Sequence, residues 1–456
     1  MDNNKPVILP LEKRTGKQKE LFFIWFASNI GILGLVYGAI LVSFKLSFLQ
    51  CLLAAAVGSL SFALVGYLGI PGKGAGASTF VLSRAAFGIK GNYIPTLIGW
   101  INLAGWLSVG VVTGTLTLLS LFGAFGFSST KTLTVISLII FSALIIVSSI
   151  FGQETLVKIQ TWFTYVFGIL TLVVLLLLIP KTNWGELLSM KSGEWLGSFL
   201  PAVSIIMAGT GISWTIAASD YSCYQNPNNS SKSIFASITL GAFIPLFVII
   251  GAGVLMTTSV SGLSTSSNPI DAISHGLPKW MIIPYFITAL GGLIPQCIIA
   301  LKSARVNLET LNIKVNHASA VTIHALIMIF FTIYVLFISE NFLGNFQTFL
   351  GLLGVGLASW AATFLIDYIC IRKREGYELR LLTDKDYNQV NYRGVFSWLI
   401  GVVFGLLFTN SPFFNGPFAI GIFRDSSLGV ILAFVVSGLI SLILISYSSK
   451  KVRRNI

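Results

Sequence analysis

The chain of 456 residues is 55% hydrophobic and only 10% charged, whereas soluble domains carry about 25% charged residues. This composition excludes a soluble globular protein and predicts an integral membrane protein whose surroundings are a lipid bilayer. The formal net charge of +13 does not call for a nucleic-acid partner, because the distribution of the basic residues explains it.

About twelve windows are apolar over the roughly 20 residues that a helix needs to cross a bilayer. The predicted fold class is therefore all-α, with about twelve transmembrane helices. The windows lie near residues 21–44, 48–70, 94–123, 132–151, 157–180, 198–219, 234–257, 280–301, 318–339, 346–371, 395–409 and 428–447.

The basic residues gather on one side of this topology. An even number of spans places both termini on the same side, and 23 of the 29 Lys and Arg residues fall there. They include those of an N-terminal segment, residues 1–20, and of a basic tail, residues 448–456. Because basic excess marks the cytoplasmic face, we expect a multi-pass protein of the cell (cytoplasmic) membrane with both termini inside.

The first span is interrupted at mid-depth by Asn29, Gly31 and Gly34. Backbone that leaves its helix inside a membrane is tolerated only where protein or water satisfies it, so a break here predicts a binding site that includes Asn29. Close helix packing through small residues is the alternative. Gly34 and Gly38 form a GxxxG pair, which predicts that a neighbouring helix approaches closely.

The connection between the second and third spans contains Gly72, Gly74 and Gly76 but lacks the GK[ST] of a phosphate-binding loop. We expect a flexible cytoplasmic loop in which Arg84 anchors the chain at the inner face. In the third span, Trp106 lies too deep for the interfacial belt. It is either a packing residue or a flat surface on which a planar ring stacks.

The sixth span carries Gly209, Gly211 and Ser213 at mid-depth. Each glycine costs a helix interior about 1 kcal/mol relative to alanine, so we expect a second broken helix, with these three residues at the binding site. In the eighth span Pro295 precedes Gln296, and a simple kink and a binding role are both open. His324 in the ninth span reads as a satisfied packing residue.

Two five-span units account for the order of these features. The break at Gly211 follows the break at Gly31 by 180 residues and five spans. An odd number of spans per unit makes the second unit enter from the opposite side, which is the inverted-repeat arrangement of many transporters. The units are residues 21–180 and 198–371, followed by two additional helices in residues 395–447.

Ionisable residues are nearly absent from the predicted membrane depth. Because such residues mark ion and proton paths, their absence favours a neutral, polar and flat solute. The four cysteines are isolated and show no metal or redox spacing. With no paired carboxylates and no metal cluster, we expect no catalytic residue, no metal ligand and no cofactor, and the chain is not expected to be an enzyme.

Several short motifs together resemble the nucleobase–cation symporter 1 family, in its purine–cytosine permease branch. They are SRAAFG at residues 83–88, Gly105-Trp106 with Gly110, ASDYSCY at residues 218–224 and GAFIPLF at residues 241–247. The resemblance implies two inverted five-helix repeats plus two helices, with broken first and sixth helices around a central site. It also implies that Trp106 stacks on a base, that Gly209, Gly211 and Ser213 meet the base edge, and that Gln296 supplies an amide.

The chain departs from the pattern of this family in three places. Gly211 stands where the family usually has an aromatic residue, so that either Trp214 takes its role or the pocket is roomier. Cys223 stands where a basic residue is common. The eighth span has no Ser or Thr from Leu290 to Ile299, although sodium-coupled members use such oxygens there. This absence favours proton coupling, and both H+ and Na+ stay open as the coupling ion.

The sequence thus predicts a secondary active transporter that imports a nucleobase, cytosine or a purine, by cation-coupled alternating access. Its partners are the small-molecule nucleobase, the coupling cation and the lipid bilayer. A carrier of a thiamine-precursor pyrimidine, allantoin or hydantoin is the alternative. An amino-acid transporter or a membrane enzyme has less support.

Overall fold

The computed structural model describes residues 8–31, 33–148, 152–260, 263, 266, 269–313, 316–339, 342–411, 414–424 and 428–454. The first seven residues of the expected cytoplasmic segment and the last two residues of the basic tail lie outside this part of the chain.

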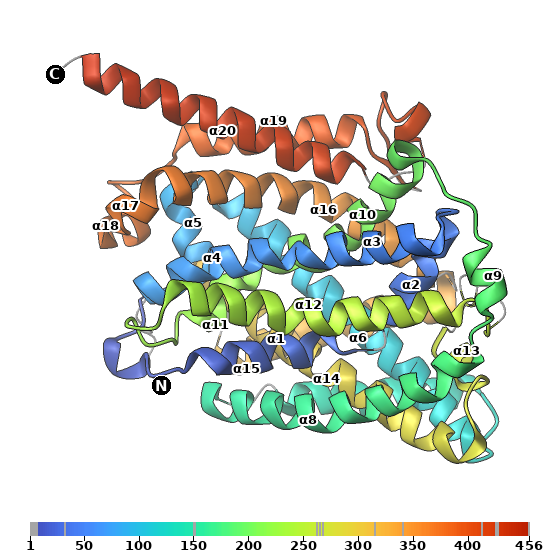
Figure 1. The fold of residues 1–456 in the computed structure, drawn as a ribbon. Helices are drawn as coiled ribbons and strands as arrows, with labels where there is room; N and C mark the ends of the chain where they lie inside the picture. Colours follow the sequence, from blue (N-terminus) through green and yellow to red (C-terminus); the bar gives the residue numbers. More distant parts are fainter. Residues whose placement is uncertain are drawn as a thin grey trace.

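The described residues are almost entirely helical, and the long helices run side by side across the molecule (Figure 1). In the first half of the chain the helices are α1 Gln18–Asn29, α2 Leu33–Ser43, α3 Phe48–Leu60, α4 Phe62–Ala75, α5 Thr79–Phe87, α6 Tyr93–Ala124, α7 Lys131–Ser148, α8 Gln153–Leu178 and α9 Trp184–Leu188. In the second half they are α10 Leu200–Met207, α11 Ala218–Ser222, α12 Ser231–Met256, α13 Pro269–Ser274, α14 Lys279–Thr310, α15 His317–Ile333, α16 Phe342–Asp367, α17 Lys373–Glu375, α18 Leu379–Thr383, α19 Tyr392–Leu407 and α20 Leu428–Arg454. A short antiparallel pair, β1 Asn410–Ser411 and β2 Phe414–Asn415, connects α19 to α20.

Ten helices of the described chain are long and apolar enough to cross a membrane, and the bent pair α1 and α2 makes an eleventh span. The remaining candidate, α19, has 16 residues, and at 1.5 Å per residue it is about 24 Å long against a hydrocarbon core of about 30 Å. The structure therefore confirms an all-helical membrane architecture, while the count of twelve spans stays a prediction.

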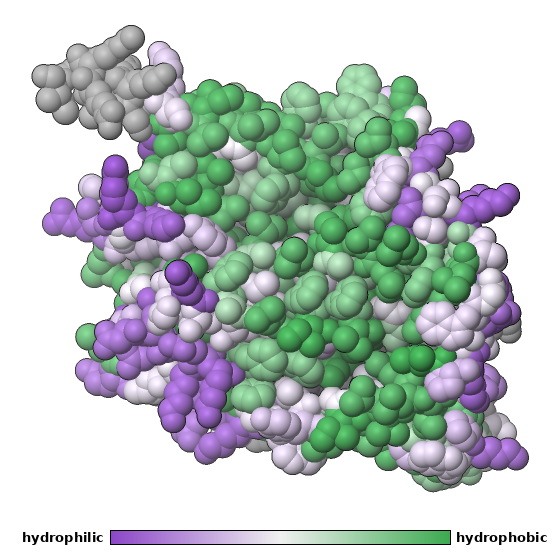
Figure 2. Space-filling view, in the orientation of Figure 1, coloured by the Kyte–Doolittle hydropathy of each residue, from purple (hydrophilic) through white to green (hydrophobic). Residues whose placement is uncertain are grey.

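The distribution of apolar side chains on the surface and in the interior of the bundle agrees with a position across a membrane. Figure 2 shows an apolar belt between hydrophilic side chains that gather at the two ends of the long helices. Helix α15 faces outward, with only 22% of its apolar window buried, whereas the span Trp195–Ser222, which contains α10 and α11, has 83% of its window buried. The sixth span is thus the centre of the bundle, and lipid-facing helices surround it.

Helix α2 packs on α12 through the predicted small-residue pair. A Cβ atom added at Gly38 would lie 2.4 Å from the carbonyl oxygen of Ile250, and one at Gly34 would lie 2.6 Å from the side chain of Ile249. Only glycine permits this distance between the backbones. The prediction of a close helix neighbour at this pair is confirmed.

The expectation of a flexible loop around Arg84 is wrong. Residues 79–87 form helix α5, and the side chain of Arg84 is buried. Its guanidinium donates to the carbonyl of Thr310 at 2.7 Å, at the end of α14, and to the carbonyl of Leu382 at 2.8 Å, in α18. Burial lowers the pKa of this guanidinium from its usual value, but its two terminal nitrogens donate to carbonyl acceptors, so it fastens α5 inside the fold instead of anchoring a surface loop.

His324 is a packing residue, as expected. The indole N–H of Trp100 donates to its Nε2 at 2.9 Å, and its Nδ1 lies 2.7 Å from the carbonyl oxygen of Ala320. Because an indole N–H can only donate, Nε2 is an acceptor and Nδ1 carries the proton. Both ring nitrogens are thereby occupied, Nδ1 within α15 and Nε2 in the hydrogen bond that joins α6 to α15.

Candidate functional site: a pocket between two interrupted helices

The first interruption separates α1 from α2, whose axes meet at 61°. Helix α14 lies directly against it, since a Cβ atom added at Gly31 would be 3.1 Å from the carbonyl oxygen of Gly292. The side-chain amide of Asn29 donates to the carbonyl of Trp25 at 2.7 Å and so closes the last turn of α1. Its oxygen accepts no hydrogen bond from the described residues and is left for the space beyond the break.

The sixth span is interrupted in a different way from the first. It stays helical throughout, but its hydrogen-bond pattern changes to a π-helical turn at Ala208–Ile212 and to a 3-10 turn at Thr215–Ala217. Such single π turns inside α-helices are frequent at functional sites. The predicted break is therefore a local change of helix type, which turns different backbone groups toward the bundle interior without unwinding the chain.

Two of the predicted site residues brace this irregular segment. The amide of Asn102, on α6, donates to the carbonyl of Ser213 at 3.1 Å, and the hydroxyl of Ser213 donates to the carbonyl of Ala208. The backbone N–H of Gly211 donates to the hydroxyl of Ser61 at 3.2 Å, and a Cβ atom at Gly211 would lie 2.3 Å from the backbone of Ser61. Gly211 therefore faces the junction of α3 and α4, and neither it nor Ser213 lines the pocket.

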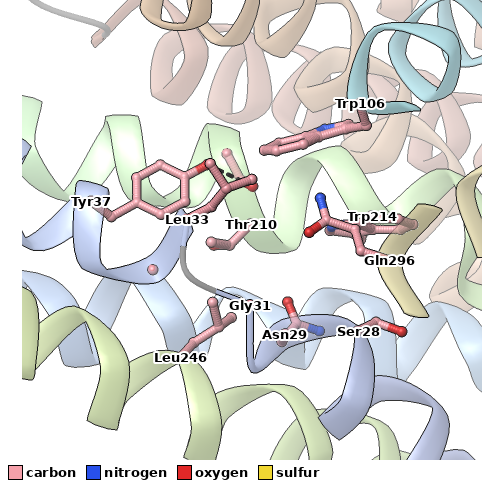
Figure 3. A pocket seen from close by; sticks show the side chains of 12 residues that line it. Ser28, Asn29, Gly31, Leu33, Tyr37, Trp106, Thr210, Trp214, Leu246 and Gln296 are labelled. Atoms are coloured by element: carbon pink, nitrogen blue, oxygen red, sulfur yellow. Dashed lines mark hydrogen bonds between the residues drawn. The ribbon is translucent and has the colours of Figure 1, made fainter. Parts of the chain in front are cut away.

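The pocket is lined by side chains and backbone from both interruptions, from α6 and from α14 (Figure 3). The other four predicted site residues meet there, namely Asn29, Trp106, Gly209 and Gln296. The complete lining is Ser28, Asn29, Gly31, Leu33, Gly34, Tyr37, Trp106, Gly209, Thr210, Trp214, Leu246 and Gln296. None of these residues carries a formal charge at neutral pH.

Aromatic side chains form the walls of the pocket and are held by further rings. Trp106 meets the ring of Phe349 edge to face at 6.1 Å between centroids. Trp214 meets Trp25 in the same way at 5.8 Å, and Trp25 also packs against Phe62 at 5.4 Å. Edge-to-face pairs contribute about 0.5–1.5 kcal/mol each beyond their burial. Both tryptophans of the pocket are therefore held by their surroundings.

Gln296 offers the principal polar group of the pocket. Its side chain is only 8% exposed, and it makes no hydrogen bond with any described residue. Figure 3 shows its amide pointing into the space between Trp106 and Asn29. A buried amide with neither its donors nor its acceptor used costs free energy unless a ligand or water pairs with it.

The pocket is narrow as it stands. The space open to the centre of a water molecule is about 20 Å³, and one water needs about 10–15 Å³ by this measure. A planar ring therefore enters only when a wall of the pocket moves. Of the two alternatives that the sequence left open at Gly211, a roomier pocket and an aromatic role for Trp214, this conformation has a narrow pocket whose lining includes Trp214.

Sequence reasoning passed over Tyr37. This residue lies on α2, beyond the first break, and its hydroxyl donates to the carbonyl of Gly209 at 3.1 Å. The signal in the sequence that could have identified Tyr37 is its phenol hydroxyl, which stands among aliphatic residues of the first span, eight positions after Asn29. The sequence indicates Trp214 only as a substitute for a missing aromatic residue, and the structure places it in the pocket.

The space between the first break and α14 is closed by backbone. Gly31 and Gly292 lie against each other, with a Cβ atom at Gly292 only 3.2 Å from the Cα atom of Gly31. Neither residue has a side-chain oxygen, and no Ser or Thr lies between Leu290 and Ile299. Any cation bound here would have backbone carbonyls as most of its ligands.

Comparison with known proteins gives three clear similarities. A model of the family described as "Permease for cytosine/purines, uracil, thiamine, allantoin" matches residues 8–424. The "Putative purine-cytosine permease YxlA" of Bacillus subtilis is 25% identical over 454 residues, which cover 97% of this chain and 95% of that protein. The purine-cytosine permease fcyB of Emericella nidulans is 24% identical over 242 residues, which cover 49% of this chain and 46% of that protein.

Among solved structures, the transporter Mhp1 has the same fold. It is described as a member of the nucleobase-cation-symport-1 family in a closed conformation with bromovinylhydantoin bound. The two chains are 19% identical and superpose with a TM-score of 0.77 over 99% of this chain and 97% of the other. This likeness confirms the predicted fold class.

The unpaired amide of Gln296 leads to a test of stability in the empty protein. We expect Gln296→Leu to leave the unfolding free energy unchanged or to raise it by up to about 1 kcal/mol, because it removes a buried polar group without a protein partner. The matched control is Gln50→Leu. The Gln50 side chain is equally buried but donates to and accepts from the backbone of Gly193, at 2.9 Å each.

The control should lose about 2–3 kcal/mol or more, since it leaves three backbone groups unpaired, the N–H and carbonyl of Gly193 and the N–H of Ser47. Thermal melting of both variants in the same detergent, without added solute, measures the difference. Equal losses for the two variants would mean that the Gln296 amide supports the fold and is not reserved for a ligand.

Proposed function

The chain belongs to the family of permeases for cytosine/purines, uracil, thiamine and allantoin, and we propose that it imports a nucleobase, cytosine or a purine, by cation-coupled alternating access. Its family and fold are those of membrane transporters and not of enzymes. In this proposal it is a symporter of the cell membrane with both termini in the cytoplasm.

The observation that carries the proposal is the unpaired amide of Gln296 beside Trp106 in a pocket without charged residues. A nucleobase is flat and neutral, and its edge carries donors and acceptors side by side. Stacking of a base on an aromatic ring contributes about 1–3 kcal/mol. A micromolar affinity corresponds to about 8 kcal/mol, which leaves the remainder to hydrogen bonds at the edge of the base.

The substrate's hydrogen-bond partners in this proposal come from both interruptions and from α14. They are the amide oxygen of Asn29 and the carbonyl of Gly209, which the interruptions turn inward, and the amide of Gln296 on α14. Gly211 and Ser213 act indirectly, because they hold the irregular segment of the sixth span in position. The proposed repeats, residues 21–180 and 198–371, meet at this pocket, and residues 395–447 lie outside them.

A ring ureide such as allantoin or a hydantoin, or a thiamine-precursor pyrimidine, is the second candidate substrate. The specific observation in its favour is the hydantoin bound to Mhp1, a protein of the same fold. These compounds are also neutral and carry amide edges, so the Gln296 amide suits them as well. Competition between solutes separates the candidates.

The proposed function predicts saturable uptake of radiolabelled cytosine in cells that lack their own nucleobase carriers. Excess unlabelled adenine, hypoxanthine, uracil or allantoin should reduce this uptake according to the preference of the pocket. For this experiment a green fluorescent protein is fused to the C-terminus. Its fluorescence measures the amount of transporter in the membrane and is expected only if the C-terminus is cytoplasmic. Inhibition by allantoin alone, or by free amino acids alone, would assign the substrate to another class.

The proposed role of Trp106 predicts that Trp106→Ala strongly reduces uptake at substrate concentrations near the KM of the unaltered protein. Loss of a stacking interaction of about 1–3 kcal/mol raises KM by about 5-fold to 150-fold. Trp106→Phe keeps an aromatic face and should retain part of the uptake. If the Ala variant is present in the membrane in the same amount and its uptake is normal, Trp106 is a packing residue and not a stacking surface for the substrate.

The backbone contact between Gly31 and Gly292 favours proton coupling. Sodium needs several oxygen ligands, and this contact provides no side-chain oxygen. We expect an inward pH gradient to drive accumulation in sodium-free medium, and a proton ionophore to abolish it. The reverse result, accumulation that requires sodium and survives the ionophore, would place a sodium site among the backbone carbonyls of the break.

A further inference from the structure

The side chain of Asn307 is a second amide on α14 without a partner. It is only 1% exposed, and neither its oxygen nor its nitrogen makes a hydrogen bond within the described part of the chain. Burial of a polar group in this way costs free energy unless a ligand or water pairs with it. Asn307 thereby repeats, far from the pocket, the condition of the Gln296 amide.

Asn307 and Gln296 lie on the same face of α14. They are 11 residues apart in one continuous helix, which is close to three turns of 3.6 residues, and a rise of 1.5 Å per residue separates them by about 16 Å. Ser303, which is buried one turn before Asn307, falls on this face as well. The second amide lies toward the end of α14 that Arg84 joins to α5, and in the proposed orientation this end is cytoplasmic.

Aromatic side chains connect the pocket to this part of α14. Trp214, in the pocket lining, meets Trp25 edge to face at 5.8 Å between centroids, and Trp25 meets Tyr221 in the same way at 6.2 Å. The hydroxyl of Tyr221 donates to the carbonyl of Ile299 at 2.8 Å and lies 3.3 Å from the hydroxyl of Ser303. The rings therefore form a continuous line of contacts from the pocket to the polar face of α14.

This line of contacts closes the direct way from the pocket toward Asn307. Trp25 lies on α1 and Tyr221 on the sixth span, and both side chains are fully buried. Alternating access moves one bundle of helices against another around the central site, so a route to the cytoplasm requires the contacts of these rings with α14 to separate. A flat solute on this route meets aromatic faces, on which a base stacks, and then the polar groups of Ser303 and Asn307.

Charged groups of opposite sign lie near this face. The carboxyl of Asp220 lies beside Ser303. The ammonium of Lys302 lies 5.3 Å from the centre of the Tyr221 ring and donates to the amide oxygen of Gln153. Because the two charges oppose each other, they give a charged solute little net attraction. The surroundings, like those of the pocket, suit a neutral ligand.

We propose that Asn307 and Ser303 form a second binding site, which the substrate occupies after it leaves the pocket and before it enters the cytoplasm. The inference rests on the proposed function and adds a release site to it. The ligand is the same neutral, planar base. The amide of Asn307 donates to and accepts from the edge of this base, as the amide of Gln296 does in the pocket, and the hydroxyl of Ser303 adds a further polar group.

The release site predicts a difference between the two faces of the membrane. Asn307→Leu removes the amide, so we expect the KM for radiolabelled cytosine or adenine offered from the cytoplasmic side to rise about threefold to tenfold, as for the loss of one hydrogen bond. The KM for the same base offered from outside should stay unchanged, because the pocket keeps all of its groups. Inverted membrane vesicles and intact cells give the two values. Gln296→Leu should raise both.

Two further variants of α14 serve as controls. Asn307→Gln keeps an amide and should retain part of the cytoplasmic affinity. Thr310→Val removes another buried polar group, a hydroxyl that bonds to the carbonyl of Val306 within its own helix at 2.9 Å, and should leave both KM values as they are in the unaltered protein.

The thermal stability of the variants separates a binding role from a structural one. Because the Asn307 amide has no partner in the described chain, Asn307→Leu should melt at the temperature of the unaltered protein. If it does not fold, Asn307→Ala replaces it. Loss of folding in both variants would make the amide a structural group and overturn the inference. An unchanged cytoplasmic KM in the folded variant, or an equal rise on both faces, would overturn it as well.

Failure of the proposed function has a different signature. In that case the unaltered protein takes up neither cytosine nor adenine in a saturable way from either face, and this inference falls with the function on which it rests. Saturable uptake by the unaltered protein, with the same KM values in Asn307→Leu, contradicts the release site alone.

Discussion

The need to pair every backbone polar group inside a bilayer governs this structure. A helix that changes type at mid-depth leaves N–H and C=O groups that lipid cannot satisfy, and the sixth span changes type twice in its middle, at Ala208–Ile212 and Thr215–Ala217. Ser61, Asn102 and Tyr37 reach it from the α3–α4 junction, from α6 and from α2, and each bonds to its backbone. The irregular segment exists because three other elements satisfy it, and they are thereby fixed around the pocket.

The same span is fastened at its other end. Asp220, in α11, accepts from the backbone N–H and the hydroxyl of Thr79 at 2.9 and 2.8 Å and so caps the N-terminus of α5. Arg84, five residues further along α5, bonds to the end of α14. The sixth and eighth spans are therefore linked through a short buried helix, which is why the connection that contains Arg84 is ordered although its glycines suggest a loop.

The pocket combines a neutral lining with one unused amide. Because no lining residue is charged, a charged solute would have to leave water without a compensating partner, which costs far more than burial of a neutral one. Gln296 and the carbonyl of Gly209 instead offer hydrogen bonds to the edge of a planar molecule. In this structure the hydroxyl of Tyr37 donates to that carbonyl.

The sequence by itself determined the membrane class, the all-helical fold, the family and the two interruptions, because apolar length and glycines at depth have direct physical consequences for a helix in lipid. It also singled out four residues of the pocket lining, Asn29, Trp106, Gly209 and Gln296. Only the tertiary structure decided which way each residue of an irregular helix faces. The π-helical turn directs Gly211 to Ser61 and Ser213 to Asn102, and it brings Gly209 to Tyr37, a contact across 172 positions of the chain. Where a helix changes its number of residues per turn, the spacing of residues in the sequence no longer predicts which way each side chain faces. The contacts of such residues are therefore decided by tertiary packing.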